Sequence, residues 1–272
     1  MSAKIISVVS QKGGVTKSTT CINLGVGLAR HGKRVLLVDN DPQGSMTISL
    51  GFQHPEKIAI KTDDVLSKII LKLPIEPGEG ILHNAEGVDL MPSGIELAAM
   101  EMNMTDEKER ETIMKRYLET VRFMYDFIII DCMPSLSLLT INALAAADYL
   151  LIPTQPQFLS AKGIEQIMDT VQKVRRSINP NLRVAGILLT MVDHNSNFTQ
   201  DVIAALHESY EGLIRFFYSQ IPRSVRAAEA SAAGKSIYAY DPKGRVAAAY
   251  SGLTREVMRI VQPGPTESSA PA

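Results

Sequence analysis

The sequence predicts an α/β fold in which a doubly wound, mostly parallel β-sheet is flanked by helices. Short apolar runs rich in β-branched residues alternate along the chain with amphipathic segments of helical length. Such runs are typical of strands buried on both faces of a parallel sheet, and helices are the usual connections between them. A glycine-rich segment follows the first run directly, as expected for a loop that joins a strand to a helix at a ligand site.

Each expected element follows from its local pattern. The continuous apolar runs predict strands at residues 4–9, 34–39, 127–131, 149–154 and 183–190. Helical patterns lie at residues 17–30, 105–121, 137–147, 162–178, 197–209 and 252–261. Ser93 and Glu96 have the spacing of a capping box before a short helix. Residues 53–87 are the least regular part, and we expect them to form a surface excursion.

Length and composition favour a single soluble domain. The chain has 272 residues, of which 45% are hydrophobic and 21% charged, and we expect one domain at residues 1–262 followed by a disordered Pro/Ser/Ala-rich tail at 263–272. Cys21 and Cys132 are too few for a disulfide framework and lack metal-site spacing, so we expect buried, reduced thiols. The start of the chain lacks a signal-peptide pattern, and no 18-residue apolar stretch is free of polar interruptions. These features predict a cytoplasmic protein.

Charge is unevenly distributed along the chain. The net charge is −1, yet the segment from Arg215 to Arg259 holds eight basic and three acidic residues, a balance of +5 that leaves −6 for the rest. A bias of this size usually marks a solvated helical face. The alternative is a surface that contacts nucleic-acid phosphates.

The glycine-rich segment SVVSQKGGVTKSTTCINL, residues 7–24, has the context of a phosphate-binding loop but not the standard pattern. G-x-x-x-x-G-K-[ST] would require glycines at positions 11 and 16, which hold Gln11 and Thr16. The glycines are instead Gly13 and Gly14. A glycine turn that opens a helix binds anions through converging backbone N–H groups and the helix dipole. In this setting Lys17 would contact the β- and γ-phosphates, and the next hydroxyl would ligate Mg²⁺.

Read as K-G-G-x-x-K-[ST], the loop resembles the deviant Walker A motif of the ParA/MinD family. Further similar segments follow in order: VLLVDNDPQGSMTISLG, YDFIIIDCMPSLSLLTINALAAADYLLIPTQP, GILLTMVDHNSN and IPRSVRAAEASAAGKSIYAYDPKGRVAAAY. The last is similar to the run that marks ParA-type partition ATPases in particular. Only a strand fits before the loop, so the resemblance is to the short form without an N-terminal helix-turn-helix. It implies a P-loop NTPase fold.

The resemblance also implies roles for individual residues. Lys12 is the signature lysine that reaches the nucleotide of the partner subunit, Lys17 binds phosphate, and Asp41 positions the attacking water, with Asp39 further from the metal. The alternative for each aspartate is a cap on the turn after its strand. The implied nucleotide contacts are Lys12, Gly13, Gly14, Val15, Thr16, Lys17, Ser18, Thr19, Met191, Pro222 and Arg223, the magnesium-binding residues are Ser18, Asp41 and Asp131, and the DNA contacts are Arg223, Arg226, Lys235 and Arg245.

Three departures from the family pattern accompany these matches. Most members have glycine where this chain has Thr16, many have a proline at the position of Met133, and many have arginine at that of Asn195. Packing is the alternative role for Met191 and Pro222, because such residues commonly fill space at strand ends.

The function implied is that of an ATPase that partitions DNA. ATP or ADP with Mg²⁺ would be the cofactors, and Mg·ATP would drive homodimerisation and sequence-independent binding of double-stranded DNA. A ParB-like centromere-binding protein would stimulate slow hydrolysis and release. The protein would then be cytoplasmic, and nucleoid-associated when ATP-bound.

Three alternatives remain open at this point. A MinD-like membrane ATPase would need a terminal amphipathic helix, whereas this chain ends in PGPTESSAPA, so we expect no membrane partner. An iron–sulfur carrier would need paired cysteines. A weakly hydrolysing nucleotide switch would be consistent with Thr16.

Overall fold

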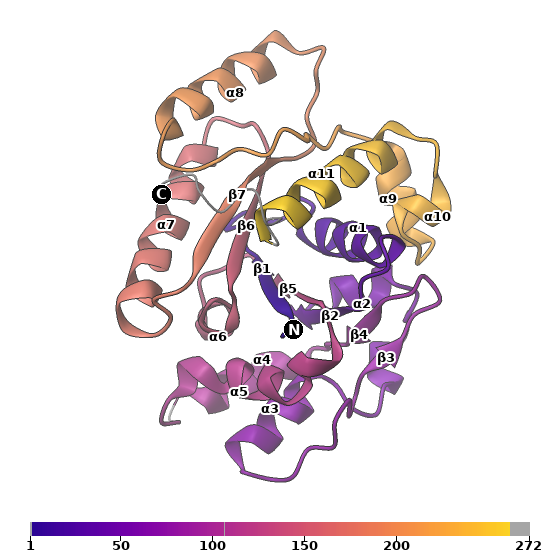
Figure 1. Ribbon diagram of the computed structural model, residues 1–272, viewed down its shortest axis with the longest axis vertical. Helices are drawn as coiled ribbons and strands as arrows, with labels where there is room; N and C mark the ends of the chain where they lie inside the picture. Colours follow the sequence, from indigo (N-terminus) through magenta and orange to yellow (C-terminus); the bar gives the residue numbers. More distant parts are fainter. Residues whose placement is uncertain (1, 106, 262–272) are drawn as a thin grey trace.

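The computed structural model describes residues 2–105 and 107–261, and its centre is a seven-stranded sheet (Figure 1). The strand order is β3-β4-β2-β5-β1-β6-β7, and the β3–β4 pair is antiparallel whereas the other pairs are parallel. The strands are β1 Lys4–Val8, β2 Val35–Asn40, β3 Leu82–His83, β4 Asp89–Met91, β5 Phe127–Cys132, β6 Tyr149–Thr154 and β7 Arg183–Leu189. The predicted doubly wound α/β fold is confirmed.

Helices form a layer on each face of the sheet, and each layer closes its own hydrophobic core. One layer contains α1 Lys17–Arg30, α2 Ser45–Ser49, α9 Val225–Ala232, α10 Ile237–Tyr240 and α11 Arg245–Val261. The other contains α3 Thr62–Ile70, α4 Glu96–Met104, α5 Ile113–Val121, α6 Leu138–Ala146 and α7 Ser160–Ser177, and α8 Asn197–Tyr210 packs at its edge. Short 3₁₀ turns lie at Pro55–Lys57, Arg110–Thr112 and Arg122–Met124.

The central strands form because their residues are apolar on both sides. Every residue of β2, β5 and β6 is buried, as expected for strands covered by helices on both faces. Cys21 and Cys132 are free thiols and belong to opposite cores. The expectation that both side chains are buried is confirmed. None of the helices in the described ranges is long and apolar enough to span a membrane.

The C-terminal helix lies along the helix that follows the glycine-rich loop. Helix α11 packs on α1, and the hydroxyl of the fully buried Tyr250 lies 3.2 Å from Oγ1 of Thr20. Residues 252–261, predicted as helix, are the second half of α11. The predicted tail, residues 263–272, lies outside the described residues.

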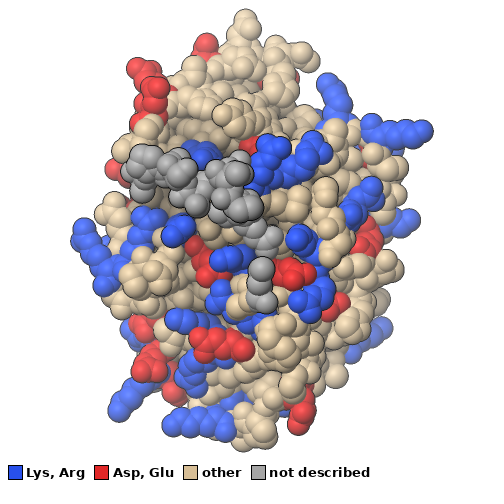
Figure 2. Space-filling view, viewed as in Figure 1, with Lys and Arg blue, Asp and Glu red and all other residues tan. Residues whose placement is uncertain are grey.

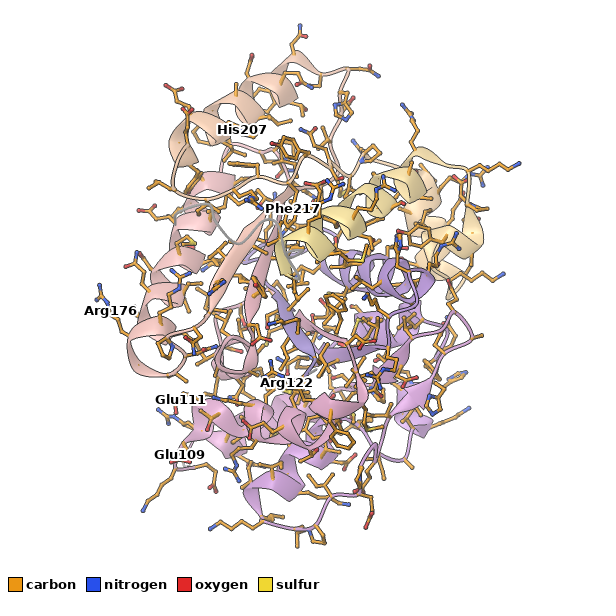
Figure 3. The ribbon with its side chains drawn as sticks, in the orientation of Figure 1. Glu109, Glu111, Arg122, Arg176, His207 and Phe217 are labelled. Atoms are coloured by element: carbon orange, nitrogen blue, oxygen red, sulfur yellow. The ribbon has the colours of Figure 1, made fainter. Side chains whose placement is uncertain are left out.

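An ion pair fixes the amino edge of the sheet, opposite to the edge where the strands end. Arg122, labelled in Figure 3, donates from Nε to the Ala3 carbonyl at 2.9 Å and from Nη2 to Oδ2 of Asp148 at 2.6 Å. The same Asp148 oxygen accepts the backbone N–H of Ile5 at 2.9 Å. These contacts hold β1 in register between β5 and β6, which sets the position of the loop that follows β1.

Three local expectations were wrong. Residues 53–87 are not a surface excursion throughout, because α3 buries Val65 and Leu66 against the sheet. The helix expected from residue 105 begins at Ile113, after a segment in which Glu109 has a left-handed φ of 56°. Ser93 does not cap α4: its hydroxyl is buried without a partner among the described residues, and Glu96 pairs with Lys61 instead.

Candidate functional site

The glycine-rich loop spans residues 9–16, between the end of β1 and the start of α1. Gly14 has a left-handed φ of 74°, and Gly13 and Gly14 are exposed with nothing near their missing Cβ positions, so the backbone stays open to a ligand. Lys17 begins α1 and is buried, with its Nζ 3.5 Å from the carbonyl of Lys12. The predicted phosphate residues Gly13 to Thr19 therefore lie together at the carboxyl edge of the sheet and the start of α1.

Side chains from the ends of two other strands hold the loop. Gln155, just after β6, donates to the carbonyl of Gly14 at 2.8 Å, and Thr190, just after β7, donates to the carbonyl of Val15 at 3.2 Å. The sequence analysis did not identify either residue. The available signal was that both are polar and directly follow apolar strands whose carboxyl ends meet at this edge.

Thr16 occupies a backbone conformation that threonine rarely adopts. Its φ and ψ are 63° and 31°, in the left-handed region, where a β-branched residue is strained. Its hydroxyl is also buried without a hydrogen-bond partner in the described structure. The glycine that most relatives are expected to carry here would adopt this conformation without strain.

Replacing Thr16 by glycine is therefore expected to stabilise the protein. Relief of the strain gains about 1–2 kcal/mol, and the extra freedom of glycine in the unfolded chain costs about 0.5–1 kcal/mol. The net gain should raise the melting temperature by roughly 2 °C, measured by calorimetry. Thr19→Gly, inside α1, is the matched control and should lower it. A lower melting temperature for Thr16→Gly would contradict the strain argument.

Three aspartates meet beside the loop. Asp39 and Asp131 are register partners at the ends of β2 and β5, and Asp41 follows β2 directly. Burial, followed by the negative charge of Asp39, raises the pKa of Asp131 to about 8, while the Ser18 hydroxyl and the Lys17 charge lower it. Burial also raises the pKa of Asp39 to about 6 against its hydrogen bonds to Thr47. The negative charge of these three aspartates is thus poorly compensated by protein groups alone.

Hydrogen bonding separates the roles of Asp39 and Asp41. Oδ2 of Asp39 accepts the Thr47 N–H and hydroxyl at 2.8 and 2.7 Å, and Oδ1 accepts the Asp41 N–H at 3.3 Å. Asp39 therefore fixes the loop that carries Asp41. In Asp41 one oxygen caps the turn by accepting the Gln43 N–H at 2.9 Å, and the other makes no hydrogen bond to the described residues. That oxygen could hold a water.

The residues fit a magnesium ion bound together with phosphate. Both carboxylate oxygens of Asp131 are buried and lack a partner of normal hydrogen-bond geometry, and Ser18 lies next to them. Within the described ranges no group of three or more His, Cys, Asp or Glu side chains forms a protein-only metal centre. Mg²⁺ is commonly held by one or two carboxylates, a hydroxyl and substrate phosphates, which matches this donor set.

The predicted nucleotide contacts outside the loop, Met191, Pro222 and Arg223, lie on neighbouring segments beside it. The backbone N–H of Val192 donates to the Ile221 carbonyl at 3.0 Å, and that of Arg223 donates to the Val192 carbonyl at 3.1 Å, so Val192, which follows Met191, pairs with Pro222. The Met191 sulfur lies 2.8 Å from Nε2 of Gln155, which also holds the loop. Met191 has a left-handed φ of 52°.

Lys12 is placed differently from Lys17. Its side chain is exposed at the rim of the loop, and its Nζ donates to the side-chain oxygen of Gln157. Of the other two departures, Met133 is half-buried and its sulfur accepts from Ser137 at 3.2 Å, and Asn195 is exposed. Nothing in the structure links the departure at Met133 or the one at Asn195 to a change in the site.

The predicted DNA-contacting residues lie on the α9–α11 side of the molecule. All four are exposed, and Figure 2 shows several Lys and Arg over the region where Figure 1 places α9, α10 and α11, as over other parts of the same face. Arg226 forms an ion pair with Glu229 at 3.1 Å, so its charge is partly compensated. Lys235 and Arg245 form no ion pair with described residues and are the stronger candidates for phosphate contacts.

Comparisons with known proteins extend over almost the whole chain. An AAA-domain family matches residues 3–184. The sporulation initiation inhibitor protein Soj of Bacillus subtilis is 41% identical over 93% of this chain and 98% of its own, and the chromosome partitioning protein ParA of Caulobacter vibrioides is 34% identical over 94% of each. A crystal structure named cobyrinic acid a,c-diamide synthase from Mycobacterium smegmatis, with bound ADP and magnesium, is 33% identical, covers 94% of each chain and has a TM-score of 0.82.

Proposed function

This chain belongs to the AAA-domain family of P-loop proteins that includes the ParA and Soj partitioning proteins, and from that membership we propose that it is an Mg·ATP-dependent DNA-partition ATPase. In this proposal Mg·ATP drives formation of a homodimer that binds double-stranded DNA without sequence preference. Slow hydrolysis, stimulated by a ParB-like partner, releases the DNA. The protein would act in the cytoplasm and associate with the nucleoid when ATP-bound.

The observation that carries the proposal is the meeting of a cationic loop with an uncompensated carboxylate. Gly13 to Ser18 offer backbone N–H groups, a buried lysine and a hydroxyl, and Asp131 presents two buried oxygens without partners. A nucleoside triphosphate with Mg²⁺ would satisfy both halves, since phosphate contacts the loop and the metal takes the carboxylate side. The ADP and magnesium named for the M. smegmatis structure support these cofactors.

The remaining steps follow from the positions of Lys12 and Asp41. Lys12 is exposed at the rim rather than inside the loop, which suits a contact to the nucleotide of a facing copy. Asp41 has a carboxylate oxygen available near the metal side, which suits orientation of an attacking water. Catalysis would then rest on Lys17 and Lys12 for charge and on Asp41 for the water.

The basic α9–α11 segment supports DNA rather than another ligand. Lys235 and Arg245 are exposed and unpaired among described residues, and sequence-independent binding depends on such cations meeting backbone phosphates. The MinD-like and switch alternatives predict nucleotide binding without this DNA contact. The M. smegmatis structure, named as a synthase, also contains ADP, so nucleotide binding does not separate these candidates and the DNA assay decides.

DNA binding should therefore be measured with ATP, ADP and no nucleotide across a salt series. We expect sequence-independent binding that needs ATP and weakens steeply with salt. A double Lys235→Ala/Arg245→Ala variant should lose most of it. Four lost cations per dimer would lower the slope of log affinity against log salt by about 3.6, at about 0.9 per phosphate contact.

The matched control replaces two exposed lysines in the opposite helix layer, Lys108→Ala/Lys115→Ala, and should bind as the unmodified protein does. Absence of DNA binding at low salt with every nucleotide would contradict the partition proposal and favour a protein-only switch.

A further inference from the structure

A pocket of about 300 Å³ lies beside the glycine-rich loop, on the side away from the aspartate cluster. Its walls come from the loop, the end of β6 with the residues that follow it, and the first turns of α7. Lys12 contributes one edge and Lys162, on the first turn of α7, contributes another. The sequence analysis assigned no role to Lys162.

The charged side chains that line the pocket are both basic. Lys12 and Lys162 are both exposed lining residues, and the lining contains no aspartate or glutamate. Lys162 also makes no ion pair within the described ranges. Two lysines around one concavity favour an anionic occupant, because no acidic side chain of the lining compensates their charge.

The contact made by Lys12 leaves its charge available. Its Nζ donates to the Gln157 side-chain oxygen, a neutral acceptor that orients the ammonium without cancelling its charge. A carboxylate at this position would instead form an ion pair. Gln157 is therefore a positioning residue for Lys12.

Two further features mark the mouth of the pocket as a contact face. Helix α7 has eighteen residues, no side-chain cap at its start and no acidic residue in its first turn, so its positive dipole end adds to the two lysines. Phe158 and Leu159, immediately before α7, are 84% and 70% exposed. Two adjacent apolar side chains beside a concave, basic site suit a contact with a second protein surface.

We propose that Lys162 is a second lysine, on the same pocket as Lys12, that contacts the terminal phosphates of ATP bound to a second copy of this chain. The pocket would receive that phosphate end when two copies face each other, while Phe158 and Leu159 pack against the facing copy. This inference rests on the proposed ATP-dependent dimer. It assigns the cationic contact across the dimer to two side chains rather than to Lys12 alone.

The test separates contact across the dimer from contact within one chain. Dimerisation should be measured by sedimentation velocity with a non-hydrolysable ATP analogue for the unmodified protein, Lys162→Gln, Lys162→Arg and Arg176→Gln. Arg176→Gln is the matched control, because this substitution removes one charge from the far end of the same helix. Figure 3 shows the Arg176 side chain pointing away from the protein. Nucleotide affinity should be measured separately with a fluorescent ATP analogue, at protein concentrations too low for dimers.

We expect Lys162→Gln to raise the dimer dissociation constant about tenfold or more, since each dimer loses two charge-assisted contacts. Lys162→Arg should restore most of the dimer, and Arg176→Gln should have little effect. The affinity of the isolated chain for nucleotide should be unchanged in all four proteins.

Three results would overturn the inference. If Lys162→Gln dimerises as well as Arg176→Gln, the second lysine has no role across the dimer. If Lys162→Gln weakens nucleotide binding by the isolated chain, it acts on its own nucleotide. If the unmodified protein stays monomeric with the analogue, the proposed dimer itself is wrong. The first two results would overturn only the role of Lys162 and would leave the proposed dimer intact.

Discussion

Replacing Lys17 by alanine is expected to weaken ATP binding on the order of 100-fold or more, so that binding is lost in an ordinary titration. Lys17 is buried at the start of α1 with its ammonium beside the loop carbonyls and the aspartate cluster. A charge-assisted contact to phosphate is worth about 1.5–3 kcal/mol, and this lysine would contact two phosphates in a partly dry site. Isothermal titration with ATP and Mg²⁺ measures the effect directly.

Lys12→Ala is the control for this prediction. Lys12 is exposed and its contact is to Gln157, so its loss should leave nucleotide binding by the isolated chain nearly unchanged while impairing dimerisation. Melting curves of both variants would check that they fold. Retained ATP binding or turnover in a folded Lys17→Ala protein would show that the loop does not bind phosphate as proposed.

Replacing Asp41 by alanine is expected to stop hydrolysis while sparing ATP binding, so that the dimer accumulates on DNA. The carboxylate oxygen of Asp41 that makes no hydrogen bond to described residues is the one assigned to the attacking water. Loss of a general base or water-positioning group commonly lowers turnover about 10²–10⁴-fold. Phosphate release under saturating ATP, together with DNA retention after dilution, would measure both effects.

Asp41→Asn refines this test because the amide oxygen can still accept the Gln43 N–H and keep the turn. If the charge matters for the water, Asp41→Asn should be as inactive as Asp41→Ala although its loop is intact. Turnover near that of the unmodified protein in either variant would remove Asp41 from the mechanism.

Features carried by continuous local patterns could be predicted from the sequence. The apolar runs that became β2, β5 and β6 are buried on both faces, as expected for central strands of a parallel sheet. The carboxyl ends of parallel strands share one edge, and there the structure makes Asp39 and Asp131, which the family resemblance had assigned to one site, register partners. Their roles, like those of the other site residues, remain predictions.

Features that depend on distant partners could not be predicted. Gln155 holds Gly14 across 141 positions of sequence, and no local pattern indicates such a contact. Strand β4 has only three residues, too few for a periodic signal. Helix α3 had the signal, with apolar residues spaced along one side, but it lies between irregular turns that concealed it. The left-handed backbone of Thr16 contradicts its side-chain preference and is imposed by the surrounding loop.

The packing of Tyr250 against Thr20 determines how ATP can control DNA binding under the proposed function. Because α11 lies directly on the helix that opens from the nucleotide loop, the basic segment and the loop belong to one packed unit without an intervening hinge. Nucleotide would then alter the number of DNA-binding surfaces in one particle rather than the shape of each copy. Each copy would offer one weak DNA contact. When two copies pair, the second contact becomes intramolecular, at an effective concentration on the order of millimolar. Avidity of this kind would make DNA residence depend steeply on the fraction of paired copies, so hydrolysis in one partner would be sufficient to release both.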